Sequence, residues 1–332
     1  MNVLVTGGAG YIGSHAVKAL REAGHAVVVL DNLSRGHRAA VPADVPFEQI
    51  DLRDTARVAD ALTRHGTQCV MHFAALAYVG ESVTEPLKYY DNNTAGSISL
   101  LHAMSRAGVR RLVFSSTCAT YGEPARMPIT EDLPQSPINP YGWSKLFTER
   151  CLIDFAAANP DFAFTALRYF NVAGSAADGA IGEDHRPESH VIPLLLLTAL
   201  GKRDSFTIFG EDYDTPDGTC IRDYIHVEDL VDAHVAVMDA MNAGKLKAGN
   251  FFNLGIGQGY SVKQVVEAAR RVTGHAIPCK LGPRRPGDPP QLFANADKIR
   301  NAIGWRAKRT NLDETVATAW RWYKAHPDGY GD

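Results

Sequence analysis

The chain has 332 residues, of which 45% are apolar and 21% are charged, and its formal net charge is −3. This composition is typical of a folded globular protein with one large or two ordinary domains. A protein that binds nucleic acid through its phosphates needs a basic face, so the balance of charges argues against a nucleic-acid partner.

The N-terminal run M-N-V-L-V-T-G lacks the basic region and long apolar core of a signal peptide, and we expect none. The most apolar later stretch, residues 191–200, is too short to span a bilayer, so we expect no membrane association. The five cysteines are scattered without a C-x-x-C pair. This pattern is typical of free thiols in a reducing compartment and favours a cytoplasmic protein.

Short apolar runs alternate with helical patterns through the first half of the chain. We expect strands at residues 3–5, 26–30, 69–72, 111–115 and 162–168, and helices near residues 11–23, 54–65, 87–107 and 141–158. Apolar strands that alternate with helices indicate βαβ units with right-handed crossovers and a parallel sheet covered on both faces. The predicted fold is an α/β, doubly wound, Rossmann-like parallel sheet with a smaller mixed α/β domain.

The regular alternation ends near residue 170, where Gly, Asp, Pro and His become frequent. We therefore expect a first domain at residues 1–170 and a second domain formed mainly by residues 171–332. A strand-like and helix-like stretch begins at Ile221, so the chain is expected to return to the first domain around residues 219–255.

The first predicted strand ends in the loop G-G-A-G-Y-I-G, residues 7–13. Gly7 allows a tight turn, Gly10 lets a pyrophosphate approach the backbone, and Gly13 lets the next helix pack on the strand. The N-terminus of that helix offers N–H groups and a positive dipole end to phosphates. Strand, loop and helix together predict a dinucleotide site in the first domain. The later run at residues 253–261 lacks G-K-[ST], and we expect a turn there with Ser261 capping the next helix.

Asp31 stands at the end of the second predicted strand, close to the spacing of a ribose-binding acidic residue. A carboxylate there accepts hydrogen bonds from an adenosine ribose and repels a 2′-phosphate, which favours NAD over NADP, although the nearby Arg35 softens this preference. Later strands end at Asp51-Leu52 and at Phe73-Ala74-Ala75 and are expected to lie along the same carboxyl edge, with Phe73 equally able to be a core residue.

Residues 139–145 read N-P-Y-G-W-S-K. Pro140 fits a helix start, and Tyr141 and Lys145 then share one helix face. A free tyrosine has a pKa of about 10, so to act as a base near neutral pH its phenol needs a positive neighbour. Lys145 is one such neighbour, and an oxidised nicotinamide ring is another. The pair alone is a weak signal, and a core aromatic is the plainer interpretation of Tyr141.

Together these motifs resemble the extended short-chain dehydrogenase/reductases, and among them the UDP-glucose (UDP-galactose) 4-epimerases over nearly the whole chain. The matching stretches are V-T-G-G-A-G-Y-I-G-S-H, D-N-L-S, H-F-A-A, V-G-E-S-V, Y-Y-D-N-N, F-S-S-T-C-A-T-Y-G, P-Y-G-W-S-K, L-R-Y-F-N, D-G-T-C-I-R-D-Y-I-H-V-E-D-L and P-R-R-P-G-D. The resemblance implies bound NAD, a UDP-hexose substrate inverted at C4 through a transient 4-keto sugar, and a homodimer. The helices at residues 87–107 and 141–158 are candidates to pair across a two-fold axis.

The resemblance also implies roles for individual residues. Tyr141 is the acid/base on the sugar 4-hydroxyl, Lys145 holds the nicotinamide ribose and lowers the tyrosine pKa, and Thr117 hydrogen-bonds the 4-oxygen. The cofactor site comprises Gly7, Gly10, Tyr11, Ile12, Gly13, Asp31, Asn32, Asp51, Leu52, Phe73, Ala74, Ala75, Asn92, Tyr141, Lys145 and Tyr169. The substrate site comprises Thr117, Tyr141, Asn171, Val191, Phe209, Arg222, Arg285, Asp288 and Leu292.

The side-chain chemistry of some of these predicted substrate-binding residues supports their implied roles. Arg222 and Arg285 can clamp a diphosphate through charge-assisted hydrogen bonds, although solvated surface charge is an equal alternative from the residues alone. Phe209 can stack on uracil, and Asp288 can accept from a ribose. Two positions depart from the family pattern: Ala77 replaces a lysine that contacts the cofactor in some relatives, and Leu292 replaces a tyrosine or cysteine, so acceptance of N-acetylated sugars stays open.

Other functions fit less well. A 4,6-dehydratase needs an acidic pair after Thr117, where Cys118-Ala119 stand, and no cationic pocket for a glucuronate is evident. A UDP-xylose/UDP-arabinose 4-epimerase is the closest alternative, and a catalytically silent NAD or UDP-sugar sensor is a more distant one. A metal hydrolase is disfavoured because the spacing of His185 and His190 suits no common site, so we expect ordinary loop histidines and no metal.

Overall fold

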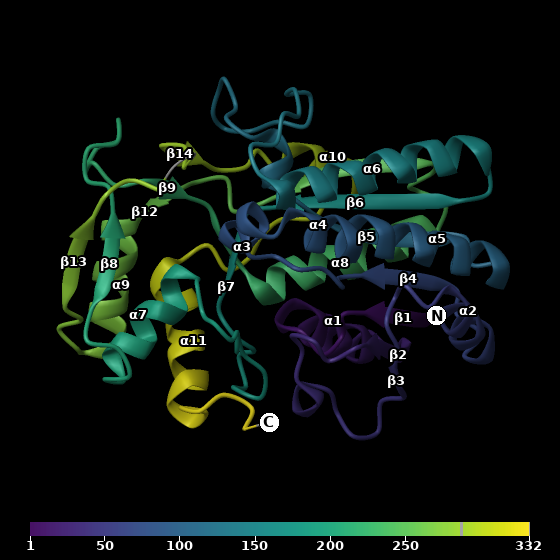
Figure 1. Cartoon of the computed structure of the whole chain (residues 1–332), viewed down its shortest axis with the longest axis horizontal. Coiled ribbons are helices and arrows are strands. Elements are labelled where there is room, and N and C mark those ends of the chain that lie inside the picture. The colour runs from purple at the N-terminus through teal and green to yellow at the C-terminus, as the bar shows by residue number, and fades with distance from the viewer. Residues whose placement is uncertain (286–287, 332) are drawn as a thin grey trace.

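The computed structural model describes residues 1–285 and 288–331, so the last motif above, P-R-R-P-G-D, includes two residues outside the described ranges. Its larger part, on the right in Figure 1, is a seven-stranded sheet whose neighbouring strands all run parallel. In spatial order the strands are β11 (Gly249–Leu254), β6 (Ala163–Tyr169), β5 (Arg111–Thr117), β4 (Cys69–His72), β1 (Asn2–Thr6), β2 (Ala26–Asp31) and β3 (Phe47–Gln49).

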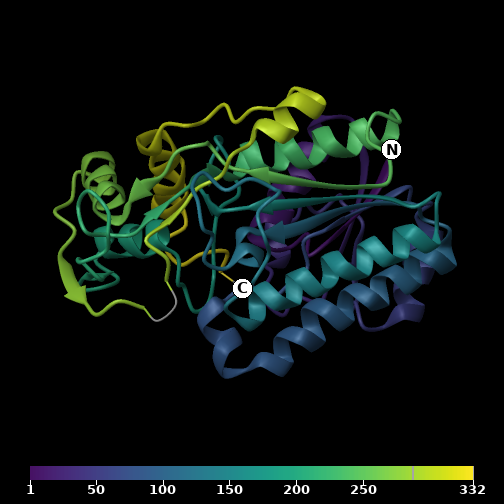
Figure 2. The ribbon, with the colours of Figure 1, turned by 90° about the horizontal axis from the view of Figure 1, so that it is seen from above.

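Helices cover both faces of this sheet, as the view in Figure 2 shows. Helices α1 (Tyr11–Glu22), α8 (Val227–Asn242) and α10 (Asp297–Ile303) share one apolar core with the strands. On the other face α2 (Thr55–Arg64), α5 (Gly96–Ala107) and α6 (Pro140–Ala158) share a second core. Strands buried on both sides explain the continuous apolar runs of the sequence, and the predicted doubly wound α/β fold is confirmed.

The predicted helix at 87–107 is less regular than expected. It divides into α4 (Pro86–Tyr89), the π-helical segment η2 (Tyr90–Ala95) and α5, and the short helix α3 (Val79–Thr84) precedes them. Within η2 the Asn93 side chain accepts from the backbone N–H of Leu76 at 2.8 Å and donates to its carbonyl at 3.0 Å. A π segment of this kind commonly marks a functional position. Here its Asn93 holds the loop after β4 in place through these two hydrogen bonds.

The smaller part, on the left in Figure 1, is built from short sheets and packed helices. Helices α7 (Val191–Ala199), α9 (Val262–Thr273) and α11 (Leu312–Ala325) share its apolar core. The short strands pair as β7 (Asn171–Ala173) with β10 (Tyr224–His226), β8 (Phe206–Phe209) with β13 (Cys279–Gly282), and β9 (Ile221–Arg222) with both β12 (Tyr260–Ser261) and β14 (Gln291–Leu292). The remaining short elements are the 3-10 turns η1 (Arg38–Ala40) and η3 (Cys118–Tyr121).

The chain passes between the two parts more than once. Strand β11 pairs with β6 at the edge of the large sheet, and α8 packs against α1. Later still, α10 returns to the same core through Ile299, which the sequence did not predict. Ser261 caps α9 in a capping box with Gln264, as predicted.

Candidate active site

The strands β1, β2, β4 and β5 end at one edge of the sheet, and a cavity of about 440 Å³ opens there between the two parts of the molecule. Ligands of open parallel sheets bind at this edge. Most residues predicted for cofactor and substrate line the cavity: Gly7, Gly10, Tyr11, Ile12, Gly13, Asp31, Asn32, Asp51, Leu52, Phe73, Ala74, Ala75, Asn92, Thr117, Tyr141, Lys145, Tyr169, Asn171, Arg222, Asp288 and Leu292. Val191, Phe209 and Arg285 are outside this lining.

The glycine loop has the close packing that its sequence predicted. Gly7 has a φ of +71°, and a Cβ there would come within 2.5 Å of the backbone nitrogen of Ala74. A Cβ on Gly13 would come within 2.0 Å of the Gly7 carbonyl oxygen. Gly10 precedes α1, and no side chain caps that helix end. The N–H groups of the first turn of α1 therefore have no side-chain acceptor and are available to donate hydrogen bonds to a phosphate in the cavity.

Asp31 lies at the end of β2 as a largely buried carboxylate. It accepts hydrogen bonds from the backbone N–H groups of Ala9 at 3.0 Å and Leu33 at 2.8 Å. Burial raises the pKa of Asp31, and these backbone hydrogen bonds oppose the rise. Arg35 is held by Glu81, with an Nη2–Oε1 distance of 3.0 Å, so it is already paired rather than free for a 2′-phosphate. The site therefore fits NAD better than NADP.

Thr117, Tyr141 and Lys145 meet where β5 and α6 approach each other. The Asn139 side chain accepts from the N–H of Gly142 at 2.9 Å, so α6 begins at Pro140 and places Tyr141 in its first turn. The Thr117 hydroxyl, which also accepts from the N–H of Ala119, shares a hydrogen bond with the Tyr141 phenol. These contacts bring the predicted acid/base and its relay together in one buried place.

Burial determines the direction of the Tyr141 pKa shift in this structure. Burial raises its pKa to about 12, although the hydrogen bond with Thr117 lowers it, and Lys145 is not among the groups that act on it. Burial also lowers the pKa of Lys145 to about 7, against the pull of Glu149. In the chain without cofactor, burial therefore outweighs the hydrogen bond with Thr117, and the lowering of the Tyr141 pKa by Lys145 stays a prediction.

On the opposite side of the cavity Arg222 is buried and forms an ion pair with Asp288. It also donates to the carbonyl oxygen of Pro289 at 2.8 Å. The alternative of a solvated surface charge is therefore wrong for Arg222. The guanidinium of Arg285 lies 4.3 Å from the centroid of the Phe209 ring, so these two form a cation–π pair beyond the cavity lining.

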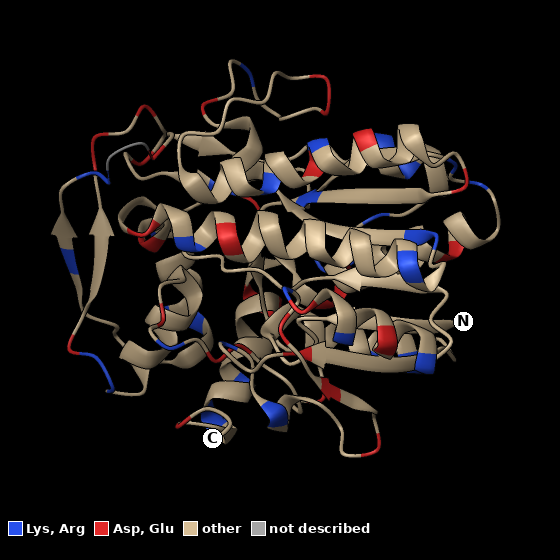
Figure 3. Cartoon of the chain, turned by 45° about the vertical axis from the view of Figure 1, so that its right-hand side comes forward, with Lys and Arg blue, Asp and Glu red and all other residues tan. Residues whose placement is uncertain are grey.

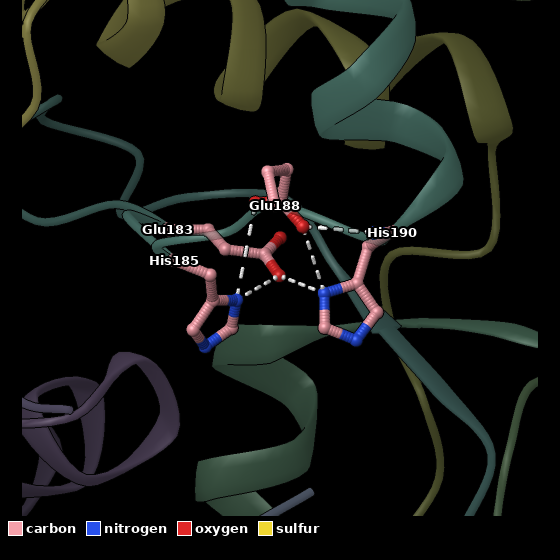
Figure 4. Close-up of side chains that lie close together, drawn as sticks. All are labelled: Glu183, His185, Glu188 and His190. Atoms are coloured by element: carbon pink, nitrogen blue, oxygen red, sulfur yellow. Dashed lines mark hydrogen bonds and ion pairs between the residues drawn. The ribbon is translucent and has the colours of Figure 1, made fainter. Parts of the chain in front are cut away.

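One group of cavity residues was given no role by the sequence, which predicted ordinary loop histidines at His185 and His190. Glu183, His185 and His190 line the cavity, and Glu188 lies beside them, as Figure 4 shows. The Nδ1 atom of His190 is 2.8 Å from Oε1 of Glu183, and that of His185 is 3.1 Å from the same oxygen. The sequence signal was available in E-D-H-R-P-E-S-H, where acidic residues and histidines alternate, but it lies in an irregular loop. These histidines are therefore not ordinary loop residues.

Burial disfavours the charged form of His190, but Glu183 and Glu188 outweigh this effect and raise its pKa to about 10. The Glu183 pKa is lowered to about 2, since the two histidines outweigh the burial that would raise it. In the chain by itself this loop therefore carries an ion pair at neutral pH.

Comparison with known proteins identifies the family and the fold. The NAD dependent epimerase/dehydratase family model matches residues 3–255. The chain is 53% identical to the UDP-glucose 4-epimerase of Lactobacillus helveticus over 100% of both chains. It is 48% identical to UDP-arabinose 4-epimerase 1 of Arabidopsis thaliana, over 99% of this chain and 81% of the relative.

A solved relative has the same fold over its whole length. The crystal structure of UDP-glucose 4-epimerase from Bifidobacterium longum in complex with NAD⁺ and UDP superimposes with a TM-score of 0.94 at 39% identity, covering 99% of this chain and 100% of the other. The glycine loop, the buried acid after β2 and the Thr-Tyr-Lys group thus stand in a fold that holds a dinucleotide and a UDP group in a relative. The chain belongs to the NAD dependent epimerase/dehydratase family.

Proposed function

We propose that the protein inverts C4 of a UDP-hexose, interconverting UDP-galactose and UDP-glucose with tightly bound NAD. The observation that carries this proposal is the single cavity that gathers the glycine loop, the Thr117–Tyr141–Lys145 group and the Arg222–Asp288 pair. The full-length similarity to UDP-glucose 4-epimerases supports the same activity. The enzyme is accordingly an isomerase.

The cofactor part of the cavity fits NAD. Tight glycine packing allows the pyrophosphate to reach the start of α1, and Asp31 is positioned to accept from an adenosine ribose. When bound, NAD supplies the acceptor and donor of a hydride, which permits a transient 4-keto sugar. The net reaction would leave NAD unchanged, so the cofactor would not need to leave the protein between turnovers.

The residues of the chain handle protons and orientation. In the proposed mechanism Tyr141 removes the proton of the 4-hydroxyl and later returns one, either directly or through Thr117. Lys145 places a positive charge near the nicotinamide ribose. Arg222 anchors the diphosphate through charge-assisted hydrogen bonds, and Asp288 accepts from the uridine ribose. Fixed orientation of these groups contributes much of the rate.

The outer substrate residues act around this anchor. Asn171 and Leu292 line the cavity beside it, so we assign them to the sugar and diphosphate. Val191 starts α7 immediately after His190, at the cavity edge. Phe209 and Arg285 are proposed for uracil and phosphate, and their mutual cation–π contact must then open or shift to admit the base.

A pentose substrate is the second candidate. The 48% identity to a UDP-arabinose 4-epimerase favours it, and a C4 inversion of UDP-xylose uses the same groups. A silent sensor is disfavoured, since it has no need of the threonine, tyrosine and lysine that meet at the end of β5.

The test is incubation of the purified protein with UDP-galactose, UDP-xylose and UDP-N-acetylgalactosamine, without added NAD. We expect UDP-glucose to form from UDP-galactose at the highest rate, measured by chromatography. Faster conversion of UDP-xylose would establish the pentose alternative, and inactivity toward all three would leave only the sensor.

A homodimer is the proposed assembly. Trp143, Phe147 and Ile153 on α6 and Ile98 on α5 are large apolar side chains exposed on neighbouring helices. In Figure 3 these two long helices face the viewer and are mostly tan, with scattered charged residues. An exposed apolar surface of this kind is typical of a protein interface. Trp143, a motif residue without a role in the chemistry, would then belong to the interface.

We also propose a cytoplasmic location. All five cysteines are free, as expected in a reducing compartment. Among the residues that the structure describes, no helix combines the length and apolar character needed to cross a bilayer.

A further inference from the structure

The loop between β7 and α7 brings four potential metal ligands to one point, which Figure 4 shows in close-up. One ligand atom from each residue, an imidazole nitrogen or a carboxylate oxygen, lies within 4.8 Å of those of the other three. Their closest measured separations are 2.8, 3.1, 3.2 and 3.9 Å. A tetrahedral zinc site with bonds near 2.0–2.1 Å separates its ligand atoms by about 3.3 Å. The four observed distances thus lie on both sides of the separation expected between the ligand atoms of a tetrahedral zinc site.

The inward atoms are buried and contact mainly one another. Nδ1 of His185, Nδ1 of His190 and Oε2 of Glu188 are shielded from solvent, and their partners in the loop are the ion pairs among these four residues. The Glu188 side chain is 7% exposed, so its free oxygen is held away from solvent and points to the cluster. Buried polar atoms normally find a partner, and converging atoms of this type are those that a cation satisfies.

The rest of the loop is held in place by other parts of the molecule. Glu188 Oε1 accepts from the backbone N–H of His190 at 2.8 Å, which fixes that carboxylate. The Asp184 carboxylate accepts from the N–H of Tyr330 at 3.0 Å. A Cβ on Gly182 would come within 2.2 Å of the Trp322 ring, so the loop lies directly against α11. The ligands are thus positioned by the fold before any ion arrives.

We propose that Glu183, His185, Glu188 and His190 form a binding site for one divalent transition-metal cation of the zinc type. Two imidazole nitrogens and two carboxylates suit Zn²⁺ or its neighbours in the first transition row, whereas Mg²⁺ prefers oxygen ligands alone. The site lies in the wall of the cavity beside Tyr11 of the glycine loop, whose ring centroid is 6.2 Å from that of His185. It is independent of the epimerase proposal, because a cation can bind here whatever the reaction.

The test is titration of the purified NAD-loaded protein, freed of metal by a chelator, with Zn²⁺ and then Co²⁺. Calorimetry is expected to give one Zn²⁺ per chain and no comparable binding of Mg²⁺. The Co²⁺ form should show the visible bands of a tetrahedral nitrogen and oxygen site, without the sulfur charge-transfer band of a cysteine site. Sulfur charge transfer, or no Zn²⁺ binding at all, would overturn the proposal and leave an ion-paired histidine cluster only.

Variants assign the binding to the four residues. The double change His185→Ala, His190→Ala should weaken Zn²⁺ binding by more than about 100-fold, because even outer-shell partners of metals contribute 10- to 100-fold. Glu183→Gln keeps the shape of the side chain and should also weaken binding. His102→Ala on α5 is the matched control. Thermal unfolding without metal checks folding, and unchanged affinity in folded variants contradicts the proposal.

Discussion

Lys145 lies one helical turn after Tyr141 on α6, and its side-chain nitrogen donates a hydrogen bond of 2.9 Å to the backbone carbonyl oxygen of Ser115. This contact ties the first turns of α6 to β5 two residues before Thr117. It also orients the lysine without a carboxylate directly beside it. Burial lowers the pKa of Lys145 to about 7, so a bound group that accepts from its side chain would favour the charged form.

Changing Tyr141 to Phe should remove the proton acceptor while keeping the ring. General acid–base groups typically contribute 10²- to 10⁴-fold, so kcat for UDP-galactose should fall by about that factor. The affinity for UDP, measured by calorimetry, should stay within about threefold, a loss below ~0.7 kcal/mol. Tyr90→Phe, outside the cavity lining, is the control, and near-normal turnover of the Tyr141 variant would rule out its proposed role.

Changing Arg222 to Lys should weaken UDP binding. Lysine keeps the charge but loses the planar fork that can engage two phosphate oxygens. A charge-assisted hydrogen bond contributes about 1.5–3 kcal/mol, so the Kd for UDP should rise by roughly 10-fold or more. Arg284→Lys, whose side chain pairs with Asp212 at the surface, should change it little. Equal effects of the two substitutions would show that Arg222 is not an anchor.

Changing Glu149 to Gln should destabilise the fold. Glu149 and Arg168 form a buried pair with two hydrogen bonds of 2.9 and 2.7 Å. Breaking such a pair from one side costs about 3–5 kcal/mol, because a buried charge loses its partner. The exposed pair of Arg150 with Asp154 on the same helix is the comparison, and Arg150→Ala should cost less than about 1 kcal/mol. Urea unfolding measures the free energy of unfolding of both variants. Similar losses of stability in the two would show that the buried Glu149–Arg168 pair is not the source of the effect.

The stability of the protein should fall in acid partly because of His72. Burial, with a smaller effect of Lys145, lowers the pKa of His72 to about 3, and its two nitrogens bond to Thr6 at 2.7 Å and Ser97 at 2.9 Å. The unfolded chain has an ordinary histidine pKa near 6.5. The folded state thus binds fewer protons, and stability present above pH 6.5 is lost as pH falls toward 3.

The loss from this one group should be about 1.4 kcal/mol for each pH unit below 6.5. His72→Asn should be less stable than the parent at pH 7.5, since a hydrogen bond is lost. By pH 5 the difference should narrow by roughly 2 kcal/mol. Urea unfolding of the parent and the variant at the two pH values checks this. If the difference in stability between them is the same at both pH values, His72 does not cause the loss of stability in acid.

Changing Phe147 to Glu should disrupt the proposed dimer. Phe147 is 43% exposed, and its ring centroid lies 5.5 Å from that of Trp143. A carboxylate at the centre of an apolar interface would have to be desolvated without a partner. Light scattering should show a dimer for the parent chain and a monomer for the variant. Leu281→Glu on β13, also exposed, should leave the mass unchanged. If the parent chain is a monomer in light scattering, the homodimer proposal is wrong.

Much of the site was predictable because its residues stand at strand ends. Apolar runs fixed the parallel sheet, and a parallel sheet brings Asp31, Ala74 and Thr117 to one edge whatever the loops do. The start of α6 followed from Pro140, whereas the cap by Asn139 is visible only in the structure. The residues of each proposed role remain predictions, as does the domain division at residue 170 with its return at 219–255.

The features that the sequence did not predict have a common physical cause, since they depend on what surrounds a side chain. The direction of the Tyr141 pKa shift depends on its burial, which spacing does not report. The pairing of Arg222 with Asp288 joins residues far apart in the chain. The cluster around Glu183 lies in a loop with no periodicity, where only tertiary packing sets which atoms converge. The π segment before α5 likewise follows from the contacts of Asn93 with the loop after β4.

The ion pair of Arg222 with Asp288 has a consequence for selectivity. An incoming phosphate does not meet a vacant cation here, because a carboxylate of the same molecule already occupies it. If Arg222 anchors the diphosphate as proposed, the ligand has to displace that carboxylate and give it a new donor. A nucleoside diphosphate could do both, since its phosphates would engage the guanidinium and its ribose hydroxyls would donate to Asp288. Inorganic phosphate could make only the first exchange, so we expect it to bind at this pair more weakly than a nucleoside diphosphate.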